Sequence, residues 1–531
     1  MNVIASPLIG DSTLIDSDCL IILLTSSASI TWIDSLEKNT KDYVENVISD
    51  EHFTAGMGQY LLLPRPLGFS AKRVYLCGLG EKALTPDTLY KCLIKGFSQL
   101  CSITKTITHT HLLLTDGLLD DIHFQRRLSG INHGSGNSRT SLRHDIVRIT
   151  GLIAKSAYEA NYRFHGYKTQ RNHNSTSTAF SRLCPMEIVV PQRYSDDDLV
   201  KQILKQQCAL NKGMTLAKDL AHMPANMCTP LYLAEQAYTL HKTFPAITTE
   251  VLSQETLSEL GMHAYLAVNK GSSFEASMPI MHYRGSDMRI NKKANKPIVI
   301  IGKGVTFDSG GITLKRNPDM HHMIYDMAGA ACVLGLMKTI ASLKLPCNVI
   351  GILATAENSI DGTAYRPGDI IQTHGKKTVE IISTDAEGRM LLADAISYSQ
   401  RYSPAAIIDI ATLTGAAITT LGHQCSALFS NTDSLTQQLV RSGEHSIDQV
   451  WPLPLWPEYY EAIESAHADM KNAGNDSPGA ITAGCFISHF AGDTPWAHLD
   501  VAGTAFKYGT QLSATGRPIP LLLHYLMSFY T

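Results

Sequence analysis

Apolar and polar positions along the chain follow two periods, and their order predicts an α/β protein. In the first third, short apolar runs predict strands at residues 20–24, 74–77, 112–114 and 186–190. Later runs predict strands at residues 298–301, 349–353, 379–382 and 407–410. Stretches with helical periodicity separate these runs. Such alternation is typical of sheets covered by helices.

A polar segment at residues 170–178 interrupts this pattern and has the composition of a loop. After it, a helix is predicted at residues 197–220, with Asp and Ser at its start. We therefore expect a smaller N-terminal α/β domain (1–193), a linker helix (194–222) and a larger C-terminal catalytic domain (223–531). The larger domain should hold a mixed sheet flanked by helices. With 531 residues, 44% of them hydrophobic, the chain can bury two cores.

Two carboxylates and a guanidinium follow the predicted strand at 379–382. They are Asp385, Glu387 and Arg389, and the apolar positions of a predicted helix begin directly after them. Charged groups at the carboxyl end of a strand lie where α/β sheets usually bind ligands, and carboxylate oxygens suit divalent cations. Acidic residues also stabilise a helix N-terminus without binding anything. This run alone leaves both interpretations open.

Two more segments carry candidate ligands. The strand at 298–301 runs into a glycine-rich segment with Lys303, Asp308 and Lys315, where glycines permit a sharp turn and close approach to a ligand. Asp326 precedes a helix predicted at residues 327–343. The spacing is not that of a P-loop or of a dinucleotide-binding turn, so a phosphate site is not indicated.

Four carboxylates can converge only if positive charge neutralises them, because like charges raise one another's pKa. Two divalent cations about 3.5–4 Å apart form a known hydrolytic arrangement. Beside them Lys303 would be a neutral amine able to ligate metal, and Lys315 could remain charged and stabilise an oxyanion. The chain has neither H-E-x-x-H nor G-x-S-x-G, which favours carboxylate ligation over a histidine zinc site or a serine nucleophile.

Four segments in order resemble the leucyl aminopeptidase (cytosol aminopeptidase) family: GKGVTFDSGGITLK, YDMAGAA, STDAEGR and ATLTGA. The resemblance is strong from residue 219 to the C-terminus and holds only in outline before it. It implies a metal-dependent aminopeptidase that releases N-terminal residues, leucine-like or otherwise apolar, from peptides with a free N-terminus. It also implies a cytoplasmic homohexamer acting in peptide catabolism.

The resemblance assigns roles position by position. The metal ligands would be Lys303, Asp308, Asp326, Asp385 and Glu387, with Asp308 and Glu387 bridging two divalent ions. The ions would be manganese or zinc, with cobalt or magnesium as alternatives. The catalytic residues would be Lys315 and Arg389, the latter holding a bicarbonate. Substrate contacts would come from Met323, Ser383, Ala386, Thr412, Leu413, Gly415, Ala502 and Ala505.

Three sites depart from the family pattern, and one of them is His222, which stands in a structural loop where the family commonly has asparagine. Ser383 stands where the family usually has asparagine, near the bound substrate's amino group in relatives, so we expect an effect on specificity or turnover. Residues 269–272 read Asn-Lys-Gly-Ser in place of the family's Gly-Gln-Gly-Ser.

Composition restricts the alternatives. The formal charge of −3 gives no polyanion-binding footprint, although a basic stretch (Arg126, Arg127, Arg139, Arg143 and Arg148) keeps a DNA-binding alternative open. Eleven cysteines without C-x-x-C favour reduced thiols in the cytosol, and the apolar run at 19–24 is too short to cross a membrane. The remaining alternatives are another two-metal hydrolase, such as a phosphoesterase, and a non-enzymatic scaffold.

Overall fold

The computed structural model describes residues 3–8, 11–80, 84–103, 107–115, 118–119, 138–164, 166–167, 185–195, 197–285, 296–316, 320–474, 478–507 and 513–530. The chain forms two compact units, Met1–Asn211 and Lys212–Thr531. The sequence boundary between them falls inside helix α7 (Asp198–Ala221). The predicted fold class, two α/β domains with the larger one C-terminal, is confirmed. The predicted domain limits stay predictions.

Unit 1 is built on a six-stranded sheet with strand order β1-β6-β5-β2-β4-β3. The pairs are parallel except for β3 with β4. The strands are β1 (Val3–Pro7), β2 (Cys19–Thr25), β3 (Tyr60–Pro64), β4 (Arg73–Gly80), β5 (Thr110–Leu113) and β6 (Met186–Val190). Every residue of β2 is buried, as expected for a central strand covered on both faces.

Helices cover this sheet. They are α1 (Ser26–Asp34), α2 (Lys38–Asp50), α3 (Pro86–Ile103), α5 (Ser138–Asn161) and the short α6 (Gln192–Ser195), with a 3₁₀ turn at Ser12–Leu14. One core joins Leu20, Ile22 and Leu24 of β2 to Trp32 of α1 and Val44 of α2. The polar segment at 170–178 and the basic residues Arg126 and Arg127 lie outside the described residues.

Unit 2 holds an eight-stranded mixed sheet with order β15-β14-β17-β13-β9-β10-β8-β7. Its centre is parallel, because β17, β13, β9 and β10 pair in the same direction. The strands are β7 (Ile247–Leu252), β8 (Met278–Arg284), β9 (Ile298–Asp308), β10 (Asn348–Asn358), β13 (Ala406–Ala411), β14 (Ser426–Ser430), β15 (Val450–Pro452) and β17 (Trp496–Asp500). Smaller sheets join β11 (Ile370–Gln372), β12 (Thr378–Glu380) and β16 (Met470–Lys471), and β18 (Phe506–Lys507) with β19 (Ser513–Ala514).

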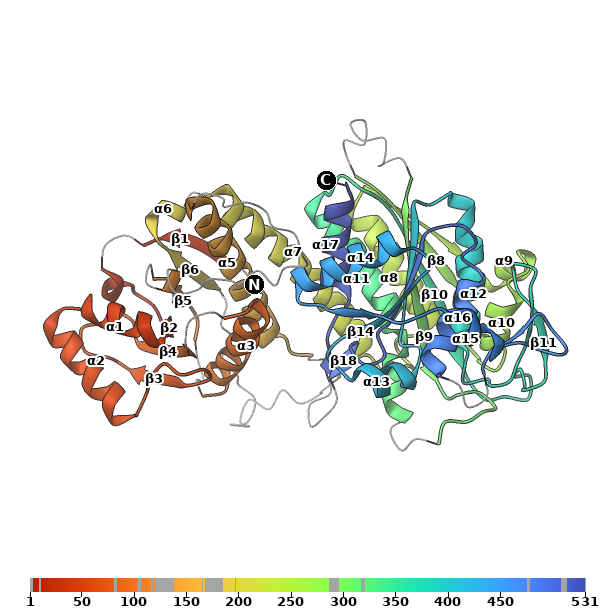
Figure 1. Ribbon diagram of the computed structural model, residues 1–531, viewed down its shortest axis with the longest axis horizontal. Coiled ribbons are helices and arrows are strands. Elements are labelled where there is room, and N and C mark those ends of the chain that lie inside the picture. Colours follow the sequence, from red (N-terminus) through yellow and green to blue (C-terminus); the bar gives the residue numbers. More distant parts are fainter. Residues whose placement is uncertain are drawn as a thin grey trace. The chain divides into compact units, whose positions relative to one another are not determined.

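Helices form a layer on each face of this sheet (Figure 1). One layer holds α8 (Pro230–Thr243), α11 (Ala328–Leu343), α14 (Asp433–Ser446) and α17 (Ile519–Tyr530). The other holds α10 (His263–Asn269), α12 (Gly388–Ser399) and α16 (Gly479–Ser488). Shorter elements are α9 (Gln254–Glu259), α13 (Gly415–Leu421), α15 (Pro457–Glu461), and the 3₁₀ helices η3 (Met320–Met327) and η4 (Gln400–Tyr402). The core of the second layer packs Met390 and Leu391 of α12 against Val299 and Ile301 of β9.

The sharp turn that the glycines permit lies after Asp308, at Gly310 and Gly311, whereas β9 runs straight through Gly302 and Gly304. A Cβ on Gly302 would come within 2.4 Å of the Gly329 carbonyl oxygen, and one on Gly304 within 3.0 Å of Ala330 Cβ. These glycines therefore let the start of α11 pack directly on β9. A glycine-rich turn and a glycine-lined helix contact give the same local sequence pattern.

The predicted strand at 379–382 is shorter and belongs to a different sheet. β12 ends at Glu380 and pairs with β11 and β16, outside the eight-stranded sheet. Local apolar runs predict a strand but not its partners, since pairing depends on residues far along the chain.

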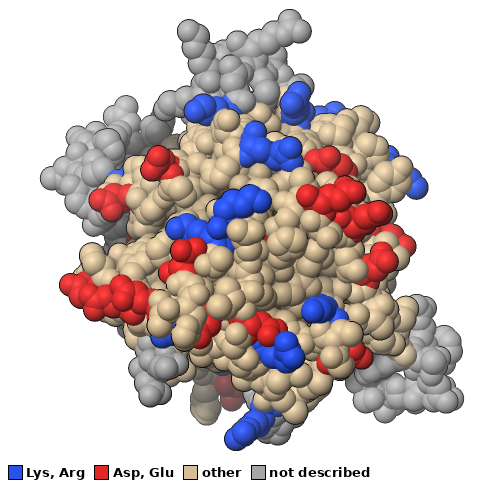
Figure 2. Space-filling model, turned by 90° about the vertical axis from the view of Figure 1, so that its right-hand side faces the viewer, with Lys and Arg blue, Asp and Glu red and all other residues tan. Residues whose placement is uncertain are grey.

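Three global features bear on the predicted environment. Among the described residues, one helical stretch, Met320–Leu343, is long and apolar enough to span a membrane, but 83% of its apolar window is buried inside the protein. All described cysteines are free. The face of unit 2 in Figure 2 carries acidic and basic side chains interspersed, without a broad field of one sign.

Candidate active site

Asp308 is placed by the end of β9 and the tight turn after it. Its Oδ1 accepts hydrogen bonds from the backbone N–H of Gly310 (2.9 Å) and from Nδ2 of Asn358 (2.8 Å) at the end of β10. Gly310 and Gly311 have positive φ angles of 86° and 62°, which side chains disfavour. The turn thus fixes Asp308 with its second oxygen, Oδ2, left for other partners.

Lys303 lies five residues before Asp308 on β9 and is 2% exposed. Its Nζ donates to Asp326 Oδ1 (2.8 Å) and to the Thr412 carbonyl oxygen (3.1 Å), and lies 2.7 Å from Glu387 Oε1. Burial favours the neutral amine, but the carboxylates of Asp326, Glu387 and Asp308 outweigh it and raise the pKa of Lys303. Lys303 therefore needs added positive charge beside it before it can act as a neutral ligand.

Asp326 is buried at the end of η3, just before α11 begins. Burial raises the pKa of Asp326 well above its usual value, with Lys303 acting in the opposite direction and Glu387 and Asp308 adding to the rise. Its Oδ1 accepts from Lys303 and from Thr412 Oγ1 (2.8 Å). Its Oδ2 is buried and has no hydrogen-bond partner among the described residues.

The loop between β12 and α12 carries Asp385 and Glu387, Arg389 follows as the second residue of α12, and buried Asn472 shapes the loop. Asn472 accepts hydrogen bonds from the N–H groups of Ile382 and Ser383, and its Nδ2 donates to the Ser383 carbonyl (2.7 Å). Arg389 Nη1 donates to the Asn472 carbonyl (2.7 Å), and burial lowers the pKa of Arg389 to about 10. Its Nε is buried without a hydrogen-bond partner among the described residues.

Lys315 contacts two of the carboxylates, Asp308 and Asp385. Its Nζ lies 2.7 Å from Asp308 Oδ2 and forms an ion pair with Asp385 Oδ1. Burial lowers the pKa of Lys315, but the surrounding carboxylates raise it by more, so the pKa is raised overall. The ammonium is therefore strongly retained, while 18% of the side chain stays exposed to an approaching ligand.

The residues present fit a pair of divalent cations. Asp308, Asp385 and Glu387 each offer a carboxylate oxygen, and these atoms lie within 4.8 Å of one another. Lys303 contacts both Glu387 and Asp326, and it thereby connects Asp326 to this group. Besides Oδ2 of Asp326, the Oε2 of Glu387 is buried and unpartnered among the described residues. Buried carboxylate oxygens without donors are the groups that metal ligation satisfies.

The predicted substrate contacts lie on neighbouring segments. Ser383 Oγ accepts from the Asp385 N–H (3.2 Å), and the Ala386 N–H donates to the Ser383 carbonyl (3.3 Å), so both belong to the ligand loop. Thr412 contacts Asp326 directly. Met323 lies in η3, one 3₁₀ turn before Asp326, and Gly415 opens α13. Ala502 and Ala505 are buried in the segment after β17.

Three residues position the site, and sequence reasoning missed two of them, Asn358 and Asn472. Asn358 ties Asp308 to the Thr384 carbonyl (3.0 Å), and Asn472 holds the ligand loop. Asp500 Oδ1 accepts from the N–H groups of Leu413 and Ala502, both at 3.1 Å, and thereby brings these two predicted substrate contacts together. No local spacing in the sequence signals the role of the two asparagines.

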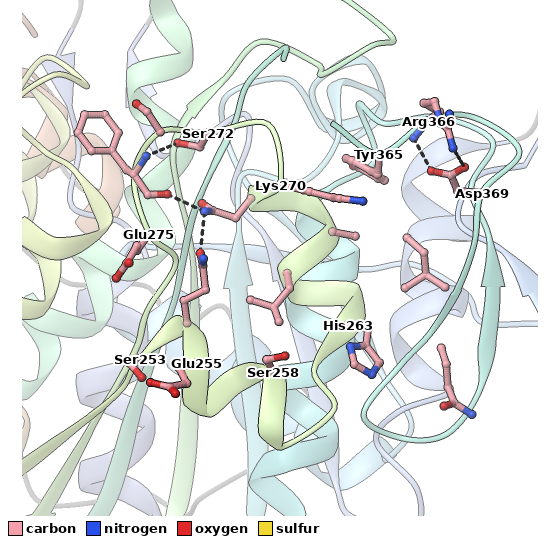
Figure 3. A pocket seen from close by; sticks show the side chains of 18 of the residues that line it. Ser253, Glu255, Ser258, His263, Lys270, Ser272, Glu275, Tyr365, Arg366 and Asp369 are labelled. Carbon is pink, nitrogen blue, oxygen red and sulfur yellow. Dashed lines mark hydrogen bonds and ion pairs between the residues drawn. The ribbon is translucent and has the colours of Figure 1, made fainter. Parts of the chain in front are cut away.

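A cavity of about 1200 Å³ opens elsewhere in unit 2, lined by α9, α10 and the segments 269–275 and 365–372 (Figure 3). None of the predicted site residues lines it. Two hydrogen bonds account for the asparagine at position 269, where the family usually has glycine. Its Nδ2 donates to the Phe274 carbonyl (2.7 Å) and its Oδ1 accepts from the Glu357 N–H (2.9 Å). An asparagine here closes the loop with its side chain, which glycine cannot do.

Carboxylates, two lysines and an arginine gather beside the mixed sheet of this α/β unit. This set of groups has the chemistry of a metal-dependent hydrolase. The model of the cytosol aminopeptidase family's catalytic domain matches residues 215–523, and that of the same family's N-terminal domain matches residues 23–118. The chain belongs to the cytosol aminopeptidase family. It is a metal-dependent aminopeptidase, a hydrolase of peptide bonds.

Individual relatives agree over nearly the whole chain. A probable cytosol aminopeptidase of Tolumonas auensis is 38% identical over 516 residues, which cover 96% of each chain. A cytosol aminopeptidase of Haemophilus influenzae is 38% identical and covers 96% of this chain and 97% of its own. The solved bottromycin maturation enzyme BotP in complex with Mn gives a TM-score of 0.77 at 27% identity, covering 97% of this chain and 100% of that one. The DNA-binding, scaffold and phosphoesterase alternatives are not favoured.

Proposed function

We propose that this aminopeptidase uses a dinuclear centre held by Lys303, Asp308, Asp326, Asp385 and Glu387. The observation that carries the proposal is the convergence of these side chains, with buried carboxylate oxygens left unpartnered on Asp326 and Glu387. Asp308 and Glu387 would bridge the two ions. Asp385, whose side chain is 36% exposed, would complete the more exchangeable site.

Manganese or zinc is the proposed occupant, with cobalt or magnesium as alternatives, because oxygen and amine ligands accept all of them. The manganese in the solved structure of the BotP relative favours manganese here. When bound, such a pair of ions polarises a carbonyl and lowers the pKa of water.

The residues around the centre would supply orientation and charge. The ammonium of Lys315, held 2.7 Å from Asp308, would stabilise the developing oxyanion of the scissile peptide. Asp326 would receive the free amino terminus of the peptide. Arg389, whose Nε is left without a partner among the described residues, would hold a bicarbonate that serves as general base.

The proposed substrate is a peptide with a free N-terminus and an apolar, leucine-like first residue. The contacts proposed for its side chain, which include Met323, Leu413, Ala502 and Ala505, are apolar and suit such a residue. Ser383 would lie near the amino group, where its single hydroxyl offers less hydrogen bonding than the family's amide.

We also propose a cytoplasmic homohexamer, as the family resemblance implies and as the name of the relatives suggests. Two large exposed apolar side chains on unit 2 support self-association: Trp451 is 62% exposed and Trp456 is 61% exposed. Exposed apolar groups of this size are common at interfaces between subunits.

The test is hydrolysis of a panel of aminoacyl fluorogenic amides after chelation and add-back of single metals. We expect chelation to abolish turnover, manganese or zinc to restore it, and leucine-like amides to be cleaved fastest. A phosphate ester assayed with manganese is the control and should not be cleaved. Turnover that persists without metal, or a preference for charged first residues, would overturn the proposal.

A further inference from the structure

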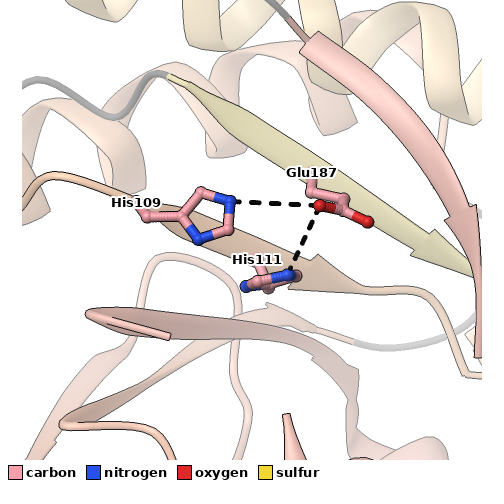
Figure 4. Close-up of side chains that lie close together, drawn as sticks. All are labelled: His109, His111 and Glu187. Atoms are coloured by element: carbon pink, nitrogen blue, oxygen red, sulfur yellow. Dashed lines mark ion pairs between the residues drawn. The ribbon is translucent and has the colours of Figure 1, made fainter. Parts of the chain in front are cut away.

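A second group of metal-binding side chains lies in unit 1. His109 stands immediately before β5, His111 is the second residue of β5, and Glu187 is the second residue of β6 (Figure 4). His109 and His111 are two residues apart on an extended chain, so they project to the same face. Glu187 is the direct partner of His111 in the register of these parallel strands. The sheet itself therefore brings the three groups together.

The three side chains converge without satisfying one another. Glu187 Oε2 lies 3.5 Å from Nε2 of His111 and 3.9 Å from Nε2 of His109, both too long for good hydrogen bonds. One donor atom from each residue lies within 4.8 Å of the other two. The imidazole rings meet edge to face, with centroids 4.5 Å apart. A small movement of the side chains would bring all three donors within about 2.0–2.2 Å of one ion.

Burial is graded across this cluster. The side chain of His111 is 12% exposed and that of Glu187 is 22% exposed, whereas His109 is 44% exposed. Beyond His111 on the same face lie the apolar side chains of Leu113 and Val189, in the core of unit 1. Burial, together with His109, lowers the pKa of His111 against the opposing effect of Glu187 and Asp16. His109, the most exposed of the three side chains, leaves the site open to solvent.

We propose that His109, His111 and Glu187 bind one divalent ion, zinc by preference. The site is separate in sequence and in ligand chemistry from the aminopeptidase centre. Two imidazoles and one carboxylate suit zinc, with further positions left for water. Calcium and magnesium prefer oxygen ligands and would not compete. Such an ion would join β5 to β6 and stabilise unit 1 when bound.

The affinity should be moderate. Nδ1 of His111 is buried without a hydrogen-bond partner among the described residues. Ligating histidines usually donate this second N–H to a carboxylate or carbonyl, and loss of that contact weakens metal binding about 10–100-fold.

Equilibrium dialysis of the full chain against Zn²⁺ tests the proposal. The protein is compared with the variant His109→Gln/His111→Gln, and with His282→Gln as a matched control. His282 also faces a glutamate across neighbouring strands, with 3.6 Å between its Nε2 and Glu250 Oε1. Because the aminopeptidase centre is intact in all three, its ions cancel in the comparison. We expect the double variant to bind about one Zn²⁺ fewer per chain, and the control to match the unmodified protein. Equal zinc content at saturation in all three would overturn the proposal.

Thermal unfolding gives an independent readout. Zn²⁺ should raise the melting temperature of the unmodified protein and of His282→Gln more than that of the double variant, and Ca²⁺ should not separate them. The Mn²⁺-supported peptidase activity of the double variant should be unchanged, and its melting transition without Zn²⁺ should match that of the unmodified protein, which shows that unit 1 folds. If the double variant does not fold, the exposed His109→Gln replaces it, with zinc binding expected to weaken tenfold or more. The same zinc affinity in His109→Gln and the unmodified protein would also overturn the proposal.

Discussion

Gly388 leaves just enough room for the side chain of Lys303. A Cβ at Gly388, the first residue of α12, would lie 2.7 Å from both Cδ and Cε of Lys303 and 2.8 Å from its Nζ. Lys303 cannot simply move aside, because Asp326, Glu387 and the Thr412 carbonyl hold its Nζ. A glycine on one segment therefore determines where an amine on another lies.

The first prediction concerns this contact. Gly388→Ala should displace Lys303 and weaken metal binding about 10–100-fold, as changes behind a metal ligand typically do. Metal titration of the apoprotein followed by activity measures it. The control is Gly362→Ala, since a Cβ at Gly362 meets nothing within 4 Å. Normal metal affinity in Gly388→Ala would show that the position of Lys303 does not matter.

The second prediction separates Lys315 from the metal ligands. Lys315→Met should lower kcat by about 10²–10³, because it removes a charge aimed at the oxyanion. Since Lys315 contacts Asp308 and Asp385 without being a proposed ligand, bound metal should be retained. Turnover and metal content are measured on the same sample. Near-normal kcat in the metal-loaded variant would remove Lys315 from the mechanism.

The third prediction concerns Ser383. Asparagine at this position can make the same contact to the Asp385 N–H that the serine hydroxyl makes now. Ser383→Asn should therefore keep metal content and thermal stability while changing KM or kcat for apolar aminoacyl amides. Ser383→Ala, which loses the contact, should cost about 1 kcal/mol of stability. If Ser383→Asn loses metal or stability, Ser383 has a structural role instead of one in substrate binding.

The fourth prediction is a loss of stability in acid that arises at His524. Its ring stacks on His445 with centroids 4.8 Å apart, and burial, with His445, lowers the pKa of His524 to about 4. The folded state thus disfavours protonation that the unfolded chain accepts near its ordinary pKa of about 6.5. Stability from the neutral ring is present above that value and is lost as pH falls toward 4.

Partial exposure to solvent reduces the size of this effect, which we expect at about 2–3 kcal/mol between pH 7 and pH 4. His524→Gln should lose less stability than the unmodified protein over this range, and the exposed His263→Gln should behave like the unmodified protein. Urea unfolding at each pH measures the difference. Parallel pH profiles for all three proteins would contradict the assignment.

The sequence predicted the two-unit α/β architecture and the side chains that meet at the candidate site, for identifiable reasons. Asp308, Asp385 and Glu387 stand in segments that resemble the family's motifs in order, and this resemblance allowed their grouping to be inferred where the spacing alone left it open. The sheet that contains β12 could not be predicted from the sequence, because a three-residue strand reveals nothing about its partners. Asn472 could not be found either: it contacts Ser383 and Arg389 across more than eighty residues of sequence.

Anomalous diffraction from crystals loaded with Mn²⁺ tests most directly whether five side chains hold a pair of ions. Two peaks about 3.5–4 Å apart are expected, with Asp308 and Glu387 touching both and Lys303 touching one. In crystals of Asp385→Ala, one of the two peaks should weaken or vanish while the fold is kept. A single ion in the unmodified protein, or peaks away from these five residues, would contradict the dinuclear centre.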